Sequence, residues 1–402
     1  MRPPLHTLAA CALLLAACSG SAGELPAPAQ PVEEPRPSGP AEAVLVSTSF
    51  SADRDYPRVP AERSTIYMPQ GDWSYTHHPH LTYFRGAFHA VCSNGRAGED
   101  EPGQRVLIAS STDFRIWSTP RVVVDASAGS YGVPTTVTPG GIRVCEGRLV
   151  LYYTENDYDP EAGRRVDSRL YAVTSPDGEH WNEPVRLPYT TFPSQRPLRL
   201  RDGRLVMTGN DRFYLTDCPD GVEGWHKVSM GGAEQDQSGL ITAREMQPNL
   251  CEGMLFEHRN GNLYCLFRNT KGDGYLWQSQ SGDGGESWTL PVRSGFTDSN
   301  TKNCFLTLPD GRGLYVGTPD NSRPGERTPL VVALSEDGYR FDNIHILADD
   351  CYEMQYAGRW KGGQFGYPFA YVRDGRLYVV VSRRKERLDA IVCNLSDLKP
   401  KP

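Results

Sequence analysis

The chain lacks an excess of positive charge and has few long apolar runs. Its 402 residues carry a formal net charge of −7. A mildly acidic protein has no general attraction to nucleic acid, so we expect no nucleic-acid partner, and any anionic ligand must be held by locally placed cations. Beyond the first 17 residues, no apolar segment is long enough to span a bilayer. Helical periodicity is also almost absent, which argues against an α/β fold.

Cysteines with the close CxxC spacing of a zinc site are missing as well. The chain has 10 cysteines; apart from Cys11 and Cys18, they are spread between Cys92 and Cys393. An oxidising compartment would permit disulfides among them. The sequence does not select a pairing. We therefore assign no metal ligands and expect no cofactor.

The amino terminus has the features of an export signal. Arg2 precedes an apolar stretch that ends in Leu15-Ala16-Ala17-Cys18 and is too short for a stable membrane span. This ending resembles a bacterial lipobox, which implies that residues 1–17 are a lipoprotein signal peptide and that Cys18 is lipidated; a plain secretory signal cut elsewhere is the alternative. Residues 18–45 are rich in proline and alanine and predict a disordered tether. We expect a protein of the bacterial cell envelope that faces outside the cytoplasm, in the periplasm or at the cell surface, with the lipid anchor as its only membrane contact.

A short motif repeats along the rest of the chain. Each copy places Ser, Asp and an aromatic residue in one order, as in SGDGGESW at 281–288. Further copies are STDFRIW at 111–117, SPDGEHW at 175–181 and SEDGYRF at 335–341; DCPDGVEGW at 217–225 is degenerate, and Ser396-Asp397-Leu398 is a candidate for the end of the last unit. Repeats at intervals of several tens of residues are typical of solenoids and propellers. The copies give about six units.

Each copy, which we call an Asp box, has the chemistry of a hairpin turn. The Asp carboxylate accepts backbone N–H groups, Gly takes the position with positive φ, and the aromatic ring packs between neighbouring units. Short alternating strands lie between the turns, as at 204–207, 263–267 and 377–381. We therefore predict an all-β fold over residues 46–402, a six-bladed β-propeller with four-stranded antiparallel blades and Asp-box turns. The Asp boxes themselves are expected to be structural.

One segment carries a more specific pattern. EGMLFEHRNGNLYCLFR runs from Glu252 to Arg268 and precedes the clearest Asp box. The spacing of Glu252, Glu257, Gly261 and Arg268 resembles a segment of the sialidases, and the chain resembles the sialidase superfamily over nearly all of residues 60–390. The resemblance implies that Glu252 polarises a tyrosine and that Arg268 binds the substrate carboxylate.

The same family resemblance implies a second arginine eight residues before the Ser of the next Asp box. Arg327 stands there, ahead of Ser335, and Arg323 is the nearby alternative. Two arginines from adjacent blades could hold one carboxylate through charge-assisted, forked hydrogen bonds. Arg268 and Arg327 are therefore the implied substrate-binding pair.

The implied nucleophile is Tyr367. Sialidases carry a Tyr-Ser-x-Leu segment shortly before their last long strand, and Gly366-Tyr367-Pro368-Phe369 stands there, so the Tyr matches and the Ser and Leu do not. A phenol with a pKa near 10 is a poor nucleophile and needs a base beside it, which is the role implied for Glu252. A neutral Tyr–Glu couple also avoids the repulsion that a bare carboxylate meets from an anionic sugar. A Tyr367 that is merely packed is the alternative.

The implied general acid lies in the first blade. SNGRAGEDEPGQRV at 93–106 resembles the sialidase loop that carries an Arg and then an Asp. The resemblance assigns Arg96 to substrate binding and Asp100 to acid and base catalysis. Glu99 and Glu101 could raise the pKa of Asp100 and keep it protonated. The same acidic neighbours leave open a solvated loop or a cation site.

The match to the sialidases breaks at the start of the first blade. Sialidases place a carboxylate-binding Arg in a Phe-Arg-Ile-Pro segment, and the aligned residues are Thr76-His77-His78-Pro79-His80, with His77 in place of the Arg. Histidine can act as a base, an acid or a metal ligand. Strand alternation predicts that only His78 and His80 point to one face, although three histidines in four residues also allow a metal site. We assign His77 to catalysis and His78 and His80 to substrate binding; three polar side chains capping a strand are the alternative.

Three functions remain open. The first is an exo-acting retaining glycosidase resembling sialidases, which removes a terminal acidic sugar from extracellular glycans with the pair Tyr367 and Glu252 as nucleophile and Asp100 as acid and base. The second is a propeller lyase or rhamnose-releasing enzyme on uronic-acid glycans, in which Arg268 neutralises the carboxylate and a His or Tyr removes the adjacent proton. The third is a glycan-binding propeller without activity. We rank them in this order and expect a monomer that acts on an oligosaccharide or polysaccharide.

Overall fold

The computed structural model describes residues 44–399 apart from residue 211 and residues 232–248. All of them belong to one compact unit that spans residues 37–402. The predicted signal peptide 1–17, the lipidated Cys18 and nearly all of the predicted tether lie outside the described residues. Within the described ranges, no helix has the length and apolar character needed to cross a membrane.

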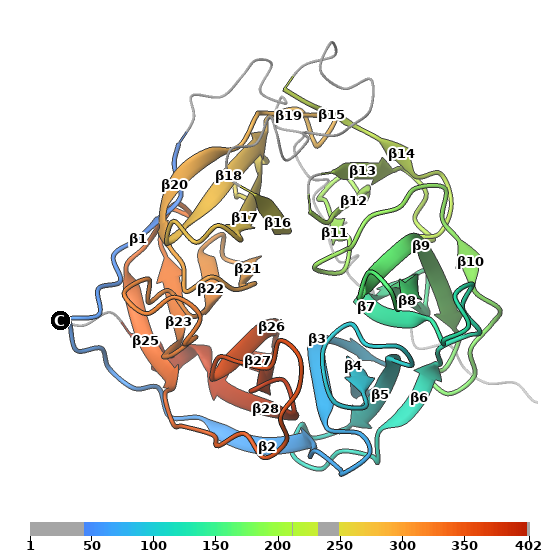
Figure 1. Cartoon of the computed structure of the whole chain (residues 1–402). Coiled ribbons are helices and arrows are strands. Elements are labelled where there is room, and N and C mark those ends of the chain that lie inside the picture. Colours follow the sequence, from blue (N-terminus) through green and yellow to red (C-terminus); the bar gives the residue numbers. More distant parts are fainter. Residues whose placement is uncertain (1–43, 211, 232–248, 400–402) are drawn as a thin grey trace, which may run out of the picture. The chain divides into compact units, whose positions relative to one another are not determined.

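Nearly every described element is a β-strand, and most strands form antiparallel sheets of four (Figure 1). Five such sheets are present among the described residues. They consist of β3 (Tyr75–Phe84), β4 (Ala87–Gly95), β5 (Arg105–Ser111) and β6 (Arg121–Val124); β7 (Thr136–Cys145), β8 (Arg148–Asp159), β9 (Arg164–Ser175) and β10 (Val185–Arg186); β11 (Leu198–Arg199), β12 (Leu205–Thr208), β13 (Phe213–Thr216) and β14 (His226–Lys227); β21 (Cys304–Thr307), β22 (Gly313–Gly317), β23 (Leu330–Ser335) and β25 (Asn343–Ala348); and β26 (Phe365–Arg373), β27 (Arg376–Arg383), β28 (Arg387–Asn394) and β2 (Glu62–Tyr67).

A further sheet has six strands. It contains β16 (Leu250–Glu257), β17 (Leu263–Asn269), β18 (Tyr275–Ser281) and β20 (Val292–Thr297), extended by the short parallel strands β1 (Ser47–Thr48) and β24 (Arg340–Phe341), and β15 (Ser229–Met230) pairs separately with β19 (Ser287–Trp288). The all-β, propeller-like fold with four-stranded blades is confirmed. The prediction of six such blades is wrong, because five four-stranded sheets are found and Ser47 joins Gly295 and Arg340 in the longer sheet.

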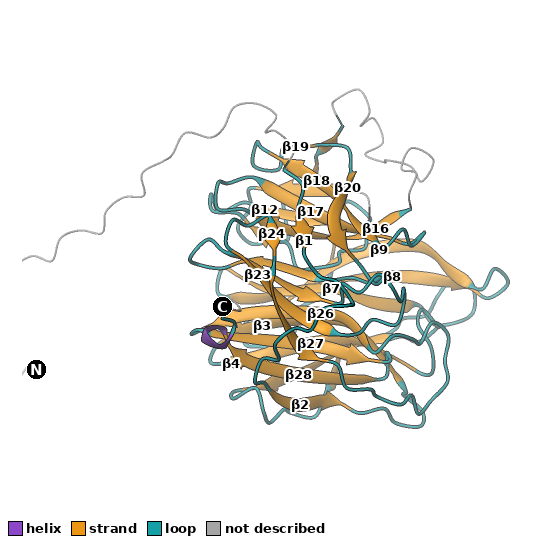
Figure 2. Ribbon diagram, turned by 90° about the vertical axis from the view of Figure 1, so that its left-hand side faces the viewer, coloured by secondary structure: helices purple, strands orange, loops and turns teal. Residues whose placement is uncertain are grey.

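The sheets follow one another around a ring, and one edge strand of each sheet lies nearest the centre of the ring (Figure 1). These inner strands are β3, β7, β11, β16, β21 and β26. Both ends of the described chain close the ring, because β2 pairs with β28 and joins Thr65 to Asp389. Among the described residues, helix is limited to the 3₁₀ turn η1 (Leu395–Asp397), visible from the side in Figure 2. The ring thus brings inner strands from distant parts of the sequence to one centre.

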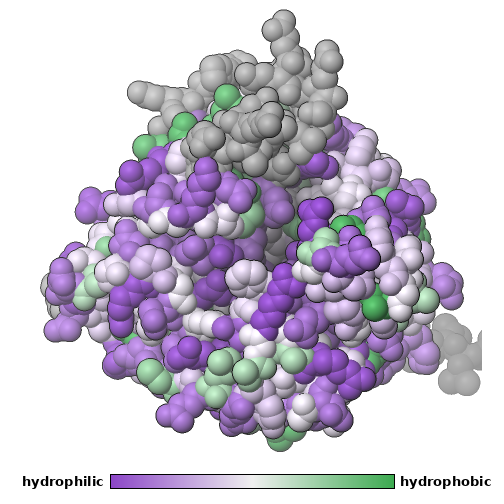
Figure 3. All heavy atoms as spheres, in the orientation of Figure 1, coloured by the Kyte–Doolittle hydropathy of each residue, from purple (hydrophilic) through white to green (hydrophobic). Residues whose placement is uncertain are grey.

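Apolar side chains fill the space between neighbouring sheets. Trp288 stacks on Phe213 of β13 with ring centroids 3.9 Å apart, and Phe256 of β16 stacks on Phe305 of β21 at 5.7 Å. Buried aromatic residues of this size contribute a large share of core stability. Hydrophilic residues predominate on the face drawn in Figure 3. The aromatic contacts between neighbouring sheets hold the inner strands in place.

The five Asp boxes between residues 111 and 341 form the turns that the sequence predicts. In the clearest copy, Asp283 Oδ1 accepts hydrogen bonds from Ser281 Oγ at 2.7 Å and from the Ser287 N–H at 3.0 Å. In the other copies, one carboxylate accepts the backbone N–H groups two and three positions later; these are Asp113, Asp177, Asp220 and Asp337. Ser396 and Asp397 lie in η1 instead, so the last unit ends in a helical turn.

Replacing Asp283 by Ala should lower the free energy of unfolding by about 1–3 kcal/mol, because Ser281 and the Ser287 N–H lose their acceptor. Urea denaturation followed by circular dichroism measures the change. Asp342→Ala is the control, since Asp342 makes only an exposed ion pair with Arg340 at 3.4 Å, and its expected loss is about 0.5 kcal/mol or less. Equal losses for the two variants would contradict the structural role of the Asp box.

The eight cysteines of the described residues are all free thiols. They include the buried Cys92, Cys145, Cys265, Cys304 and Cys393. The disulfides that an oxidising compartment would permit are therefore not formed in this structure.

Candidate active site

Three inner strands carry a bulge where they line a common cavity. β3, β16 and β26 each shift their pairing register within the strand. At each bulge a residue other than glycine has a left-handed backbone, with φ of 52° at His78, 55° at Glu252 and 52° at Tyr367. Such backbone strain costs roughly 1–3 kcal/mol per residue and is typical of functional sites. All three side chains line one cavity of about 240 Å³.

Tyr367, Glu252 and Arg268 contact one another in this cavity. Tyr367 Oη donates a short hydrogen bond to Glu252 Oε1. Arg268 Nη1 donates to Glu252 Oε2 at 3.1 Å and to Tyr367 Oη at 3.1 Å. Arg268 Nε donates to Asn300 Oδ1 at 2.7 Å, which fixes the plane of the guanidinium. The sequence placed these three residues in one site, and the structure brings them together.

The protonation states in this cluster follow from burial and charge. Burial and the negative charge of Glu252 raise the pKa of Tyr367 well above 10, so the phenol is protonated. Burial alone would raise the pKa of Glu252, but Arg268 and the hydrogen bond from Tyr367 hold it below its usual 4.5. Glu252 is therefore a carboxylate at neutral pH and can take the phenolic proton when Oη forms a new bond.

Two more cations face the ring of Tyr367. Lys302 Nζ lies 5.3 Å and Arg327 Cζ 5.6 Å from the ring centroid. Burial lowers the pKa of Lys302 to about 8, and its Nζ donates to the Ser194 carbonyl at 2.6 Å. Arg327 is 8% exposed, and its buried Nε and Nη1 have no hydrogen-bond partner. Because buried donors are nearly always paired in native proteins, the two free donors of Arg327 fit the anionic group of a ligand.

His77 and His78 lie side by side next to Tyr367. The ring centroids are 4.1 Å from Tyr367 for His77 and 5.4 Å for His78, and the two imidazoles are 4.6 Å apart. His78 and His80 both line the cavity, whereas His77 does not, although its ring lies next to those of His78 and Tyr367. The bulge at His78 interrupts the alternation of the strand. His80 also lines the cavity, and its ring packs on Phe369 at 5.2 Å.

His77 and His78 are both neutral. Burial, reinforced by Lys385, lowers the pKa of His77 well below 6.5. Burial lowers the pKa of His78 to about 3, although Glu99 opposes the shift. His77 Nδ1 shares a hydrogen bond of 2.6 Å with Ser382 Oγ, while its buried Nε2 has no partner. A neutral imidazole can accept a proton but does not replace the fixed charge of an arginine.

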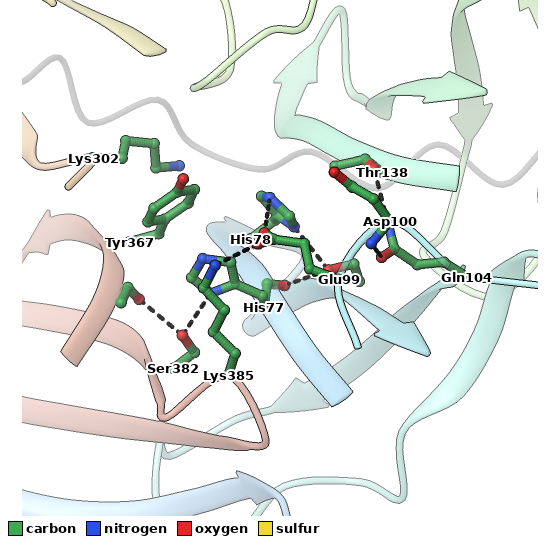
Figure 4. Close-up of polar contacts among 12 residues, drawn as sticks. His77, His78, Glu99, Asp100, Gln104, Thr138, Lys302, Tyr367, Ser382 and Lys385 are labelled. Atoms are coloured by element: carbon green, nitrogen blue, oxygen red, sulfur yellow. Dashed lines mark hydrogen bonds and ion pairs between the residues drawn. The ribbon is translucent and has the colours of Figure 1, made fainter. Parts of the chain in front are cut away.

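In the acidic loop beside these histidines, Glu99 is paired with a basic side chain and is not solvated (Figure 4). Lys385 Nζ donates a short hydrogen bond to Glu99 Oε2. Glu99 Oε1 lies 3.4 Å from His78 Nε2 and accepts from Tyr75 Oη at 3.3 Å. Burial alone would raise the pKa of Glu99, but Lys385 and the other nearby charges lower it to about 2. Glu99 is therefore ionised and holds the loop to the last sheet.

Asp100 lies across the His78–Glu99 pair from Tyr367 (Figure 4). Its Oδ1 is 3.0 Å from Arg165 Nη1, and Arg165 itself lines the cavity. Burial raises the pKa of Asp100 to about 6, against the opposing charge of Arg165. A carboxyl that titrates near 6 can donate a proton at mildly acidic pH. Asp100 itself does not line the cavity and is connected to it through Arg165.

One group of ligand atoms in this region is close enough to hold a metal ion. His77, His78 and Glu99 offer atoms within 4.8 Å of one another. Lys385 already contacts Glu99, and the charges of Lys385, Arg327 and Lys302 all lower the pKa of His77. Because a metal cation would sit among these positive side chains, the three residues fit a metal poorly.

Two arginines named from the sequence lie elsewhere. Arg96 is exposed, and its Cζ lies 4.0 Å from the ring centroid of Trp73, so the structure does not bring it to the cavity. Arg323, the alternative to Arg327, forms an ion pair of 3.2 Å with Asp320 and has a side chain that is 59% exposed. Arg327 is therefore the arginine that the structure places next to Tyr367.

Sequence reasoning missed several charged or polar residues of the site. They are Lys302, Lys385, Arg165 and Asn300. None of them belongs to a motif, and each meets its partner from a different sheet or loop. The sole sequence signal was the acidic triplet at 99–101, which needs buried bases nearby if it folds inward.

The fold and the site together define a propeller-like protein with Asp-box turns and a buried Tyr–Glu–Arg centre. Residues 90–379 match the family model described as BNR repeat-like domain. The chain belongs to this family. No curated protein matches the sequence.

Solved structures share the fold at low sequence identity. A sialidase superposes with a TM-score of 0.62 and 17% identity over 87% of this chain and 35% of its own. The Trypanosoma rangeli sialidase gives 0.61 and 13% over 84% of this chain and 60% of its own. A protein of unknown function from Dyadobacter fermentans gives 0.61 and 15% over 83% of this chain and 98% of its own. The chain thus spans less than two thirds of either sialidase, and at such identities the likeness establishes the fold alone.

Proposed function

We propose that the protein is an exo-acting, retaining glycoside hydrolase that removes a terminal acidic sugar from an extracellular oligosaccharide or polysaccharide. The observation that carries this proposal is the mutual contact of Tyr367, Glu252 and Arg268. A phenol, a carboxylate base and a buried cation lie within hydrogen-bond reach of one another. These are the groups needed by a tyrosine nucleophile that attacks an anionic sugar.

The reaction proceeds in two displacements. Tyr367 Oη attacks the anomeric carbon while Glu252 takes its proton; the bond to the leaving oxygen breaks, and Asp100 donates a proton to that oxygen. In the second step Asp100 removes a proton from water, which attacks the anomeric carbon. The bond to Oη breaks, and the proton returns from Glu252 to Tyr367. Two inversions leave the configuration of the sugar unchanged.

Arg327 and Lys302 hold the acidic group of the sugar. Support comes from the free donors of Arg327 and from the position of both cations over the ring of Tyr367. Arg268 contributes less to binding in this account, because its donors are already engaged by Glu252 and Asn300. A carboxylate between Arg327 and Lys302 would form charge-assisted hydrogen bonds.

The setting of the enzyme follows from the amino terminus. We propose that Cys18 is lipidated after removal of residues 1–17 and that the monomeric enzyme is tethered to the bacterial cell envelope by residues 18–45. Its partners are then glycans outside the cytoplasm.

The pH profile tests the assigned roles. Activity requires Glu252 ionised, so it should fall as the pH drops through the pKa of Glu252, below 4.5. Activity also requires Asp100 protonated, so it should fall as the pH rises through about 6. We expect a bell-shaped dependence of kcat/KM with a mildly acidic optimum, measured with an aryl glycoside.

Asp100→Asn is the matched variant for this profile. It should lose roughly a hundredfold or more in turnover on a natural glycoside, because no acid protonates the leaving oxygen. An aryl glycoside with an acidic phenol should be cleaved with a smaller loss, and the limb near pH 6 should vanish. A variant with an unchanged limb would exclude Asp100 as the acid.

A uronate lyase is the second candidate, and the buried, unpartnered Nε2 of His77 beside Tyr367 favours it. In this reaction a cation neutralises the uronate carboxylate, His77 removes the adjacent proton, and the glycosidic oxygen leaves by β-elimination. His77→Gln should abolish such a reaction. The hydrolase account predicts that His77→Gln keeps at least a tenth of the turnover, because His77 takes no part in its proton transfers.

A further inference from the structure

A second cavity lies farther along the same inner strands. It has a volume of about 420 Å³ and contains none of the residues that line the cavity around Tyr367. Its lining includes Leu255 of β16, three residues after Glu252, and Cys304, two residues after Lys302. Its volume falls in the range of small-molecule sites.

The charged residues of this second cavity are four arginines and one glutamate. Arg201 lies 3.9 Å from the glutamate, Glu257, and donates to the carbonyls of His258 and Arg259. Arg199 donates to two backbone carbonyls at 3.2 and 3.4 Å. Neither of the other two, Arg143 and Arg196, forms an ion pair with any carboxylate of the described residues.

Arg143 and Arg196 are packed without counterions. Arg143 donates to the Pro197 carbonyl, and its buried Nε has no partner. Arg196 makes one long hydrogen bond, of 3.4 Å, to the Leu81 carbonyl. Burial and the neighbouring Arg143 lower the pKa of Arg196 to about 10, so both side chains are cations at neutral pH. Two adjacent, partly buried cations without an anion repel each other unless a ligand supplies one.

The position of Arg196 is built into the fold. Its Cζ lies 5.5 Å from the ring centroid of Phe369 and 5.2 Å from that of Tyr371. A Cβ at Gly141 would come within 2.4 Å of the Arg196 backbone, so the close approach of β7 requires a glycine there. Apolar residues of the lining include Leu198 and Leu306, whereas the rings of Phe256 and Phe305 pack against each other in the core.

We propose that this second cavity is an anion-binding site for a compact carboxylic acid, such as an acidic monosaccharide, with Arg143 and Arg196 holding the carboxylate. The volume of about 420 Å³ suits a ring-sized body attached to that group. The site is separate from the proposed catalytic centre: Ser194 lines one cavity, and the next residues, Gln195 and Arg196, line the other.

Calorimetric titration of the full chain with glucuronate tests this site. We expect saturable binding that Arg196→Met and Arg143→Met each weaken by at least about tenfold, because each removes a charge-assisted contact. Glucose, which lacks the carboxylate, should not compete. Arg293→Met is the matched control, since Arg293 stacks on Tyr275 at 3.8 Å and does not line the cavity, and this variant should bind glucuronate like the unchanged protein.

Arg327→Met separates this cavity from the one around Tyr367. Binding that survives Arg327→Met and is lost in Arg196→Met supports the proposal. Binding lost in Arg327→Met and kept in Arg196→Met places the acid at the catalytic centre and overturns it, as does the absence of saturable binding. Arg196→Met should also leave any glycosidase turnover unchanged, so a failure of the proposed function is recognised independently.

Discussion

Tyr367→Phe should reduce kcat by roughly a thousandfold or more while the protein remains folded. The substitution removes the oxygen that Glu252 and Arg268 contact and that attacks the anomeric carbon in the proposed reaction. The ion pair between Arg268 and Glu252 at 3.1 Å is kept. Release of the reducing sugar under saturating substrate measures the loss, and circular dichroism checks the fold.

Tyr264→Phe is the control for this prediction. Tyr264 is 1% exposed, and its hydroxyl makes a long contact of 3.5 Å with Tyr339 Oη, far along its strand from the catalytic cluster. Its loss should leave kcat within about twofold of the unchanged protein, since no catalytic group is touched. A Tyr367→Phe enzyme as active as Tyr264→Phe would exclude a tyrosine nucleophile.

Glu99→Gln should lower the free energy of unfolding by about 3 kcal/mol, because it leaves Lys385 buried without a carboxylate. The side chains of Glu99 and Lys385 are 12% and 6% exposed, and their ion pair joins the loop of the first sheet to the last sheet. Urea denaturation at pH 7 measures the change. The double variant Glu99→Gln/Lys385→Met should recover most of the loss, since no unpaired charge then remains.

The same pair also predicts how stability depends on pH. The pKa of Glu99 in the folded protein is about 2, below the usual 4.5 of an unfolded chain. Its contribution is therefore fully present above pH 4.5 and is lost as the pH falls toward 2. Glu99→Gln should flatten this part of the stability profile. If Glu99→Gln changed the free energy of unfolding by less than about 0.5 kcal/mol, the ion pair would not contribute measurably to stability.

The replacement of an arginine by His77 changes the charge of the site less than the sequence suggests. His77 is neutral, but Lys302 and Lys385 add two buried cations that the sialidase-like motifs do not predict. Lys385 is neutralised by Glu99, whereas Lys302 donates to a backbone carbonyl and keeps its charge. Lys302 therefore takes over part of the carboxylate binding in the proposed reaction.

The features that the sequence predicted correctly depend on local chemistry. An Asp box contains its own acceptor, donors and glycine, so the turn at Asp283 follows from a few neighbouring residues. The spacing from Glu252 to Arg268 spans one hairpin of β16 and β17, so those two residues meet across a pair that the strand pattern already implies. Only the family resemblance assigned Tyr367 to the same site as these two residues.

The features that were missed or misplaced depend on contacts between distant segments. Lys302 and Lys385 contact Tyr367 and Glu99 from neighbouring sheets that are far apart in the sequence, and no motif predicts these contacts. At the bulge of β3, the ring of His77 lies next to that of Tyr367, a contact that strand alternation alone does not predict. The six-stranded sheet arises because Ser47, near the start of the described chain, inserts between two later strands.

The most direct test of the central claim is product analysis of the full chain incubated with sialyl-oligosaccharides and with uronate-containing rhamnosyl glycans. Mass spectrometry and ultraviolet absorbance are recorded on the same samples. The account predicts a released acidic sugar with one added water, no new chromophore, and no release by Tyr367→Phe. An unsaturated uronate without added water would contradict it and favour the lyase with His77 as the base, and the absence of any product would also contradict it.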